Sequence, residues 1–174
     1  MNQLLNQLKS QDKKMWRISR NFRLLYWVMI PVYTFLLVLF PSDDVLLVER
    51  LGGLCFVLSF VVFAVLFSKK AREFKTIDYS QPSVQMLESA VKRYRLWKPE
   101  LAWALFAILF LDAGMVLMRI PRTESDSLLM VILKVQYVLV PLIAGGFVVG
   151  IIWWYLKHKP LRDYALQLLK ALKE

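Results

Sequence analysis

Apolar residues along this chain are concentrated in four long runs, and a polar stretch at residues 68–98 divides them into two pairs. The runs cover residues 24–40, 45–67, 101–118 and 128–156. A helix crosses the hydrocarbon core of a bilayer with about 20 predominantly apolar residues. Because short turns join the runs within each pair, the pattern predicts an all-α membrane protein. Its four transmembrane helices would form two hairpins, residues 24–67 and 101–156, within a single integral membrane domain, residues 1–174.

The polar segments outside the hairpins predict amphipathic helices at the N-terminus (residues 1–23), in the central stretch and at the C-terminus (residues 160–174). In each segment, apolar residues recur at helical spacings of three and four. The N-terminal stripe contains Leu4, Leu8, Met15, Ile18 and Phe22, with Gln11 in the gap; the central stripe contains Val84, Leu87, Val91 and Tyr94; the C-terminal stripe contains Leu161, Ala165, Leu168 and Leu172. The N-terminal helix could pack on other helices or lie at the membrane surface with its basic face on anionic headgroups.

Composition and charge add an orientation to this picture. The chain is 58% hydrophobic and carries a formal charge of +10. Six of its 23 Lys and Arg residues precede the first run, eight lie in the central stretch and five follow the last run. Since basic residues accumulate on the cytoplasmic side of a membrane protein, both termini and the central stretch are expected to be cytoplasmic. This predicts a multi-pass protein of the cell (inner) membrane that contacts anionic headgroups and no nucleic acid, with its first run retained as an anchor.

No group of residues indicates catalysis, a cofactor or a metal site. The one cysteine, Cys55, lies inside an apolar run, and the one histidine, His158, lies about a hundred residues away at a predicted membrane edge. A zinc site needs several such ligands together. The sequence therefore predicts a protein that is not an enzyme and has no bound cofactor.

Four charged residues fall inside the predicted spans, where each needs a partner or a wet cavity. They are Glu49, Arg50, Asp112 and Lys134. Asp112 and Lys134 both lie roughly 9 Å from the same end of consecutive spans, at 1.5 Å per residue, so they are expected to pair. The four charges favour a salt-bridge cluster that fixes how the hairpins dock. The alternative is a polar cavity for an ion or small solute.

Small and aromatic residues indicate where the spans pack and where they meet the interface. Glycines allow close helix contact, and the candidates are Gly52, Gly53, Gly146 and Gly150. The last two form a GxxxG motif, for which packing within the bundle is favoured over a homodimer. The expected interface anchors are Trp27, Trp97, Trp153, Trp154 and Tyr155.

Two classes of function fit this architecture. The first is a scaffold or regulator that binds a cytosolic or membrane protein through a surplus apolar face of its cytosolic helices. The second is a small transporter or channel with a polar site in the outer half of the bundle. A resemblance in the order of elements between the two halves leaves an internal repeat open. If the three apolar stripes bury one another, the first hypothesis loses its apolar docking face.

Overall fold

The computed structural model describes residues 2–39, 45–77, 79, 83–96, 98–123 and 127–172, and every regular element among them is a helix. In chain order these are α1 (Asn2–Tyr33), η1 (Thr34–Leu39), α2 (Leu47–Lys75), α3 (Ser83–Arg93), α4 (Glu100–Arg119), η2 (Ile120–Arg122), α5 (Leu128–Trp153), η3 (Trp154–His158) and α6 (Lys159–Ala171). Here η1 and η3 are π-helical and η2 is a 3₁₀ turn. The predicted all-α class is confirmed for the described residues.

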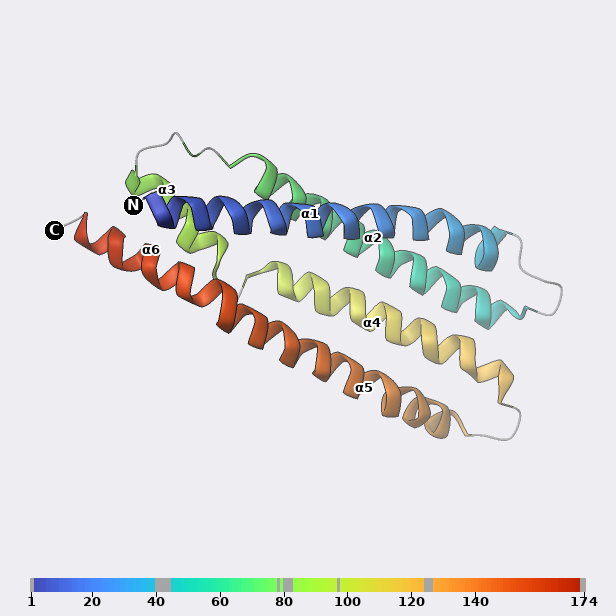
Figure 1. Ribbon diagram of the computed structural model, residues 1–174. Coiled ribbons are helices and arrows are strands. Elements are labelled where there is room, and N and C mark those ends of the chain that lie inside the picture. The colour runs from blue at the N-terminus through green and yellow to red at the C-terminus, as the bar shows by residue number, and fades with distance from the viewer. Residues whose placement is uncertain are drawn as a thin grey trace.

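The helices α1, α2, α4 and α5 run along one long axis (Figure 1). Both termini, α3 and α6 lie at one end of this axis, which we call the cap end. The chain passes from η1 to α2, and from η2 to α5, at the other end, which we call the turn end. All three basic segments of the sequence are therefore gathered at the cap end.

Three of the described helical segments are long and apolar enough to cross a membrane. They are α2, the continuous segment of α4 and η2, and the continuous segment from α5 through η3 to α6. The fourth predicted span, residues 24–40, is divided between α1 and η1, and its crossing of a membrane stays a prediction.

The expected boundaries between spans and terminal helices are absent. The N-terminal segment and the first apolar run form one helix, α1, because no glycine or proline interrupts it before Pro31. At the other terminus η3 leads directly into α6, where Pro160 occupies the first turn and so breaks no internal hydrogen bond. The first half of α1 and all of α6 thus project beyond the apolar runs along the long axis.

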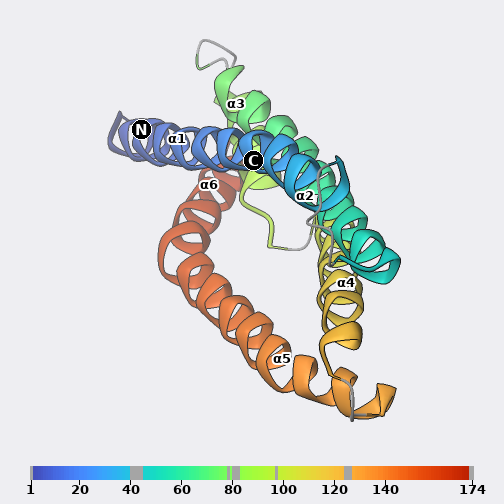
Figure 2. The same ribbon diagram turned by 90° about the vertical axis from the view of Figure 1, so that its right-hand side faces the viewer.

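The first three long helices pack closely, and α5 stands apart. Along the α1–α2 contact, ring centroids lie 5.1 Å apart in Phe22–Phe67 and 5.2 Å apart in Tyr26–Phe63. Between α2 and α4, the Ser59 hydroxyl donates to the Ala107 carbonyl at 2.8 Å. In α5, by contrast, the buried residues are Val131, Val135 and Leu139, all near the turn end. Figure 2 shows α5 diverging from the other long helices until α6 reaches the cap.

At the cap end, α3, α6 and the first half of α1 share one apolar core; we call these three elements the cap. Its buried members are Leu8, Met86, Leu87, Ala90, Tyr94, Leu161 and Ala165. Leu8, Leu87, Tyr94, Leu161 and Ala165 belong to the predicted stripes, whereas Leu172 is 49% exposed. Members of all three stripes thus share one buried core, to which the N-terminal stripe contributes Leu8.

Candidate functional site

A buried carboxylate joins the elements of the cap. Asp12 of α1 is 1% exposed. Its Oδ1 atom accepts a hydrogen bond from the Tyr94 hydroxyl at 2.5 Å, and Oδ2 accepts from the Tyr79 hydroxyl at 2.9 Å and from Arg93 Nη2 at 3.5 Å. Such a group is tolerated inside a protein when a cation and hydrogen bonds replace its hydration. Asp12 therefore fixes α1 against α3 and against the segment between α2 and α3, which contains Tyr79.

The two tyrosines are held in their neutral, donating form. Burial raises the pKa of Tyr79 and of Tyr94 above the ordinary tyrosine value, and the hydrogen bond to Asp12 and its negative charge raise both further. A neutral hydroxyl is the form that donates to a carboxylate. The network thus keeps its hydrogen bonds across the ordinary range of pH.

Tyr94 connects this network to the end of the last long helix. Its ring stacks on the His158 ring, with centroids 5.2 Å apart, and its backbone carbonyl accepts a hydrogen bond from Trp154 Nε1 at 2.9 Å. The Arg162 guanidinium in turn lies over the face of the Trp154 ring, 5.4 Å from the ring centroid. Tyr94, the residue that follows α3, therefore contacts α1 through its hydroxyl and η3 through its ring and its carbonyl.

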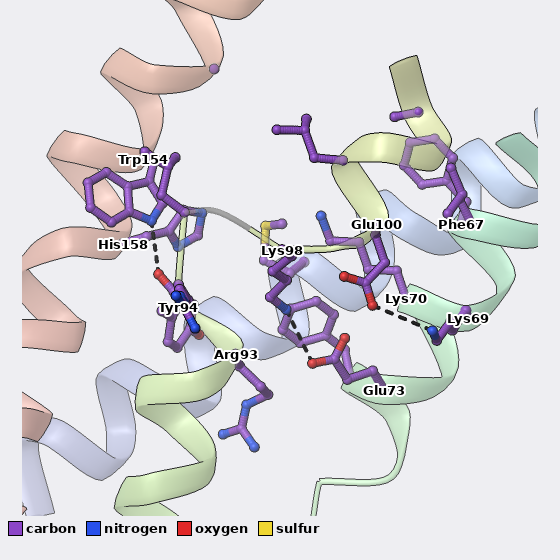
Figure 3. A pocket seen from close by; sticks show the side chains of 18 of the residues that line it. Phe67, Lys69, Lys70, Glu73, Arg93, Tyr94, Lys98, Glu100, Trp154 and His158 are labelled. Atoms are coloured by element: carbon purple, nitrogen blue, oxygen red, sulfur yellow. Dashed lines mark hydrogen bonds and ion pairs between the residues drawn. The ribbon is translucent and has the colours of Figure 1, made fainter. Parts of the chain in front are cut away.

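A cavity of about 370 Å³ lies where the cap meets the long helices. Figure 3 shows Trp154 and His158 on one side of it, with Lys69, Lys70 and Glu100 on the opposite side. The segment between α3 and α4 contributes Arg95, Leu96 and Lys98 to the lining. Its volume falls in the range of small-molecule and cofactor sites, about 300–1,000 Å³. The cavity is the candidate site of the described chain.

Two ion pairs join α2 to the region around the start of α4 at this cavity. Lys69 Nζ lies 3.5 Å from Glu100 Oε1, and Lys98 Nζ lies 3.4 Å from Glu73 Oε1. All four side chains are partly exposed, so each pair contributes little to stability. These ion pairs fix the positions of two cations and two carboxylates at the rim of the cavity.

Two of the four charges predicted inside the spans have partners outside that group of four within the described part of the chain. Glu49 is 5% exposed and accepts from Arg122 Nε at 2.8 Å, whereas Arg50 is exposed. Asp112 accepts hydrogen bonds at 2.8 Å from Gln136 Nε2. The expected pairing of Asp112 with Lys134 stays a prediction.

The predicted glycines divide into two groups. A Cβ added at Gly52 would lie 3.0 Å from the Gly114 carbonyl oxygen, and one at Gly53 would lie 2.7 Å from Leu37 Cβ, so both positions require glycine for close packing. At Gly146 and Gly150 a Cβ would meet no described atom within 4 Å. No described residue therefore packs against this GxxxG, because α5 diverges from its neighbours at this level, and its role in packing stays a prediction.

The predicted interface aromatics differ in their surroundings. Trp27, Trp153 and Tyr155 are 56%, 44% and 57% exposed, as a membrane-facing anchor requires. Trp154 instead lines the cavity and donates to the Tyr94 carbonyl. Trp97 lies outside the described residues.

The hydrophobic pattern does not mark four of the site residues: Asp12, Tyr79, Arg93 and His158. A signal for Asp12 exists: it is the only acid among the first 42 residues, and it lies one helical turn after Leu8. Helical spacing allows either Gln11 or Asp12 on the same face as Leu8 and Met15. Hydrophobicity does not distinguish them, because both are polar. No local signal marks His158, since only the fold brings its ring against Tyr94.

Comparison with protein-family models, with curated proteins and with solved structures finds no match to this chain. The geometry of the cap and its cavity is therefore the basis for the function proposed next.

Proposed function

We propose that this chain is a non-enzymatic membrane protein that acts as a scaffold or regulator through its cap, on the cytosolic side of the cell membrane. Four spans, arranged as two hairpins, would anchor it with both termini in the cytosol. The observation that carries the proposal is the cap itself. Three basic segments, distant in sequence, assemble into one unit with its own apolar core and a buried carboxylate.

The partner surface we propose is basic rather than apolar. Members of the three stripes already share one buried core, so most of their apolar surface is used within the described cap, although Tyr164 and Leu172 are 45% and 49% exposed. On the outer side of α1, Ser10, Lys13 and Arg17 are exposed and lie one turn apart. This basic face suits an acidic protein surface, which it would attract and orient through charge.

The direction of α1 favours a protein partner over the membrane surface. Because α1 continues straight from the first apolar run, Lys13 and Arg17 of the basic face lie about 16.5 and 10.5 Å beyond Leu24, at 1.5 Å per residue. Charges interact with anionic headgroups over a Debye length of about 8 Å at physiological ionic strength. The first half of α1 would thus present its cations to the cytosol.

Site-specific photocrosslinking in living cells tests this proposal. A photoreactive amino acid at Ser10 is expected to capture one discrete protein, and the charge reversal Lys13→Glu with Arg17→Glu should abolish the adduct. The matched control places the same photoreactive group at Gln167, which is exposed on α6. An adduct that survives the charge reversal, or that forms equally at Gln167, would contradict a basic docking face.

The alternative function, a small transporter or channel with a polar site in the outer half, has less support. Its candidate acids, Glu49 and Asp112, are already hydrogen-bonded by Arg122 and Gln136. The cavity lies at the cap end, whereas Glu49 lies in the first turn of α2 at the turn end. Solute-dependent flux into liposomes that contain the purified protein would favour the transporter instead.

A further inference from the structure

The cavity at the cap end has an amphipathic lining that follows the long axis. Its charged residues come from the last turns of α2, the end of α3, the segment before α4 and the first residue of α4. Several of its apolar residues, including Phe67, Leu101 and Ala104, lie further along the spans toward the turn end, whereas Phe74 and Leu96 adjoin charged residues in the chain. This order of charge followed by hydrocarbon is the order of a phospholipid at the membrane interface. It is separate from the basic face of α1 proposed above.

The charged part of the lining carries an excess of positive charge. Five cations (Lys69, Lys70, Arg93, Arg95 and Lys98) face two carboxylates (Glu73 and Glu100) in the lining. Lys69 and Lys98 pair with the carboxylates, and Arg93 lies 3.5 Å from Asp12. Among the described residues, no salt bridge involves Lys70 or Arg95. Two cations are thus available to an anionic group in the cavity.

Buried polar atoms without partners give a second, independent observation. His158 is 8% exposed, and its Nδ1 atom has no hydrogen-bond partner within the described part of the chain. The same holds for Arg93 Nε and for Glu100 Oε2. An unpaired buried polar group costs about 1–3 kcal/mol, so such groups in a cavity indicate a missing ligand. Arg93 Nε needs an acceptor and Glu100 Oε2 needs a donor, whereas His158 Nδ1 donates or accepts according to the tautomer of its ring.

We propose that this cavity binds the headgroup of an anionic phospholipid that carries hydroxyl groups, such as phosphatidylglycerol, from the leaflet on the cap side. The phosphodiester lies among Lys70, Arg95 and the unpaired nitrogens. A headgroup hydroxyl donates to Glu100 Oε2. The acyl chains follow Phe67 and Leu101 along the spans, beside Gly150, whose missing side chain leaves room.

Lipid titration of the delipidated, full-length protein in a non-ionic detergent tests the proposal, with bound lipid counted by native mass spectrometry. Phosphatidylglycerol is expected to bind saturably, with one molecule per chain, whereas phosphatidylcholine should not compete. Phosphatidylethanol has the same charge but no headgroup hydroxyl, so it should bind more weakly. Inorganic phosphate should not displace phosphatidylglycerol, because it lacks the acyl chains.

Two double variants separate the site from general charge. Lys70→Gln with Arg95→Gln should weaken phosphatidylglycerol binding about 100-fold, from a loss of about tenfold for each of the two charged contacts. Arg50→Gln with Arg119→Gln removes the same charge from exposed positions at the turn end and should leave the affinity unchanged.

Four results would overturn the proposal in whole or in part. Equal loss of affinity in the two double variants would indicate non-specific attraction. Equal binding of phosphatidylcholine would indicate ordinary annular lipid. Displacement by inorganic phosphate would indicate a free-anion site. Equal affinity for phosphatidylethanol would remove the role of Glu100 Oε2.

Discussion

Replacement of the buried carboxylate by Asp12→Ala should release the first half of α1 from the rest of the cap. The change leaves the Tyr94 hydroxyl and the Arg93 guanidinium without their shared acceptor, at sites where Tyr94 is 3% and the Arg93 side chain 10% exposed. Removing one member of a buried ion pair costs about 3–5 kcal/mol. The bond from Arg93 is long at 3.5 Å, so we expect the lower end, about 3 kcal/mol.

Hydrogen exchange measures this loss directly, because the amides of residues 8–20 exchange when the cap opens. A loss of about 3 kcal/mol corresponds to exchange about 100-fold faster, since each 1.4 kcal/mol is a factor of ten. Peptides from the spans of α2 and α4 should exchange as in the unaltered protein. Tyr94→Phe, which keeps the ring stacked on His158, should give an intermediate acceleration.

The matched control for this experiment is Asp163→Ala, which removes a carboxylate from the same cap. Asp163 pairs with the adjacent Arg162, and its side chain is 42% exposed. A pair of this kind contributes less than about 1 kcal/mol, so the exchange of residues 8–20 should change little. If Asp12→Ala left these amides within threefold of their original rates, the Asp12 network would not be what holds the cap together.

Three further predictions concern packing, a buried hydrogen bond and pH. Gly52→Val should destabilise the protein in detergent by about 1–3 kcal/mol, because a Cβ there meets the backbone of α4 at 3.0 Å, whereas Gly146→Val should leave its melting temperature unchanged. Ser59→Ala should lower stability by about 0.6 kcal/mol through loss of its bond to α4, and Ser89→Ala, at an exposed site on α3, should not. The raised pKa of Tyr94 implies that its contribution to cap stability is full below pH about 10, the unfolded value, and is lost as pH rises further. An alkaline melting series with Tyr94→Phe as reference tests this, and equal loss in both proteins would contradict it.

Local pattern was sufficient for the helical class and for the position of each apolar run. Period and run length alone predicted that the chain is all-helical, and α4 and α5 fall within a few residues of the expected runs, whereas α2 continues eight residues past its run to Lys75. The gathering of three basic segments at one end followed from charge counting. Local pattern failed at the ends of α1 and α6, because a helix continues through a change of polarity where no residue breaks it.

Which side chains meet was beyond the reach of spacing and depth. Spacing placed Gln11 in the first stripe, and depth predicted Lys134 as the partner of Asp112. In the structure, Asp12 faces the cap core and Gln136 faces Asp112, because of the way each helix is turned toward its neighbours. That direction depends on contacts between segments far apart in the sequence.

The sequence by itself determined that the chain is helical, where its apolar helices lie and which segments share a side, because these follow from composition, period and charge. Only the tertiary structure decided that the three stripes close on one another, that α5 diverges, and that a charged cavity lies between them. The central stretch shows the difference. Its sequence marks it as basic and polar, but the roles of Tyr94 and Arg93 arise only when α1 and η3 are brought against them.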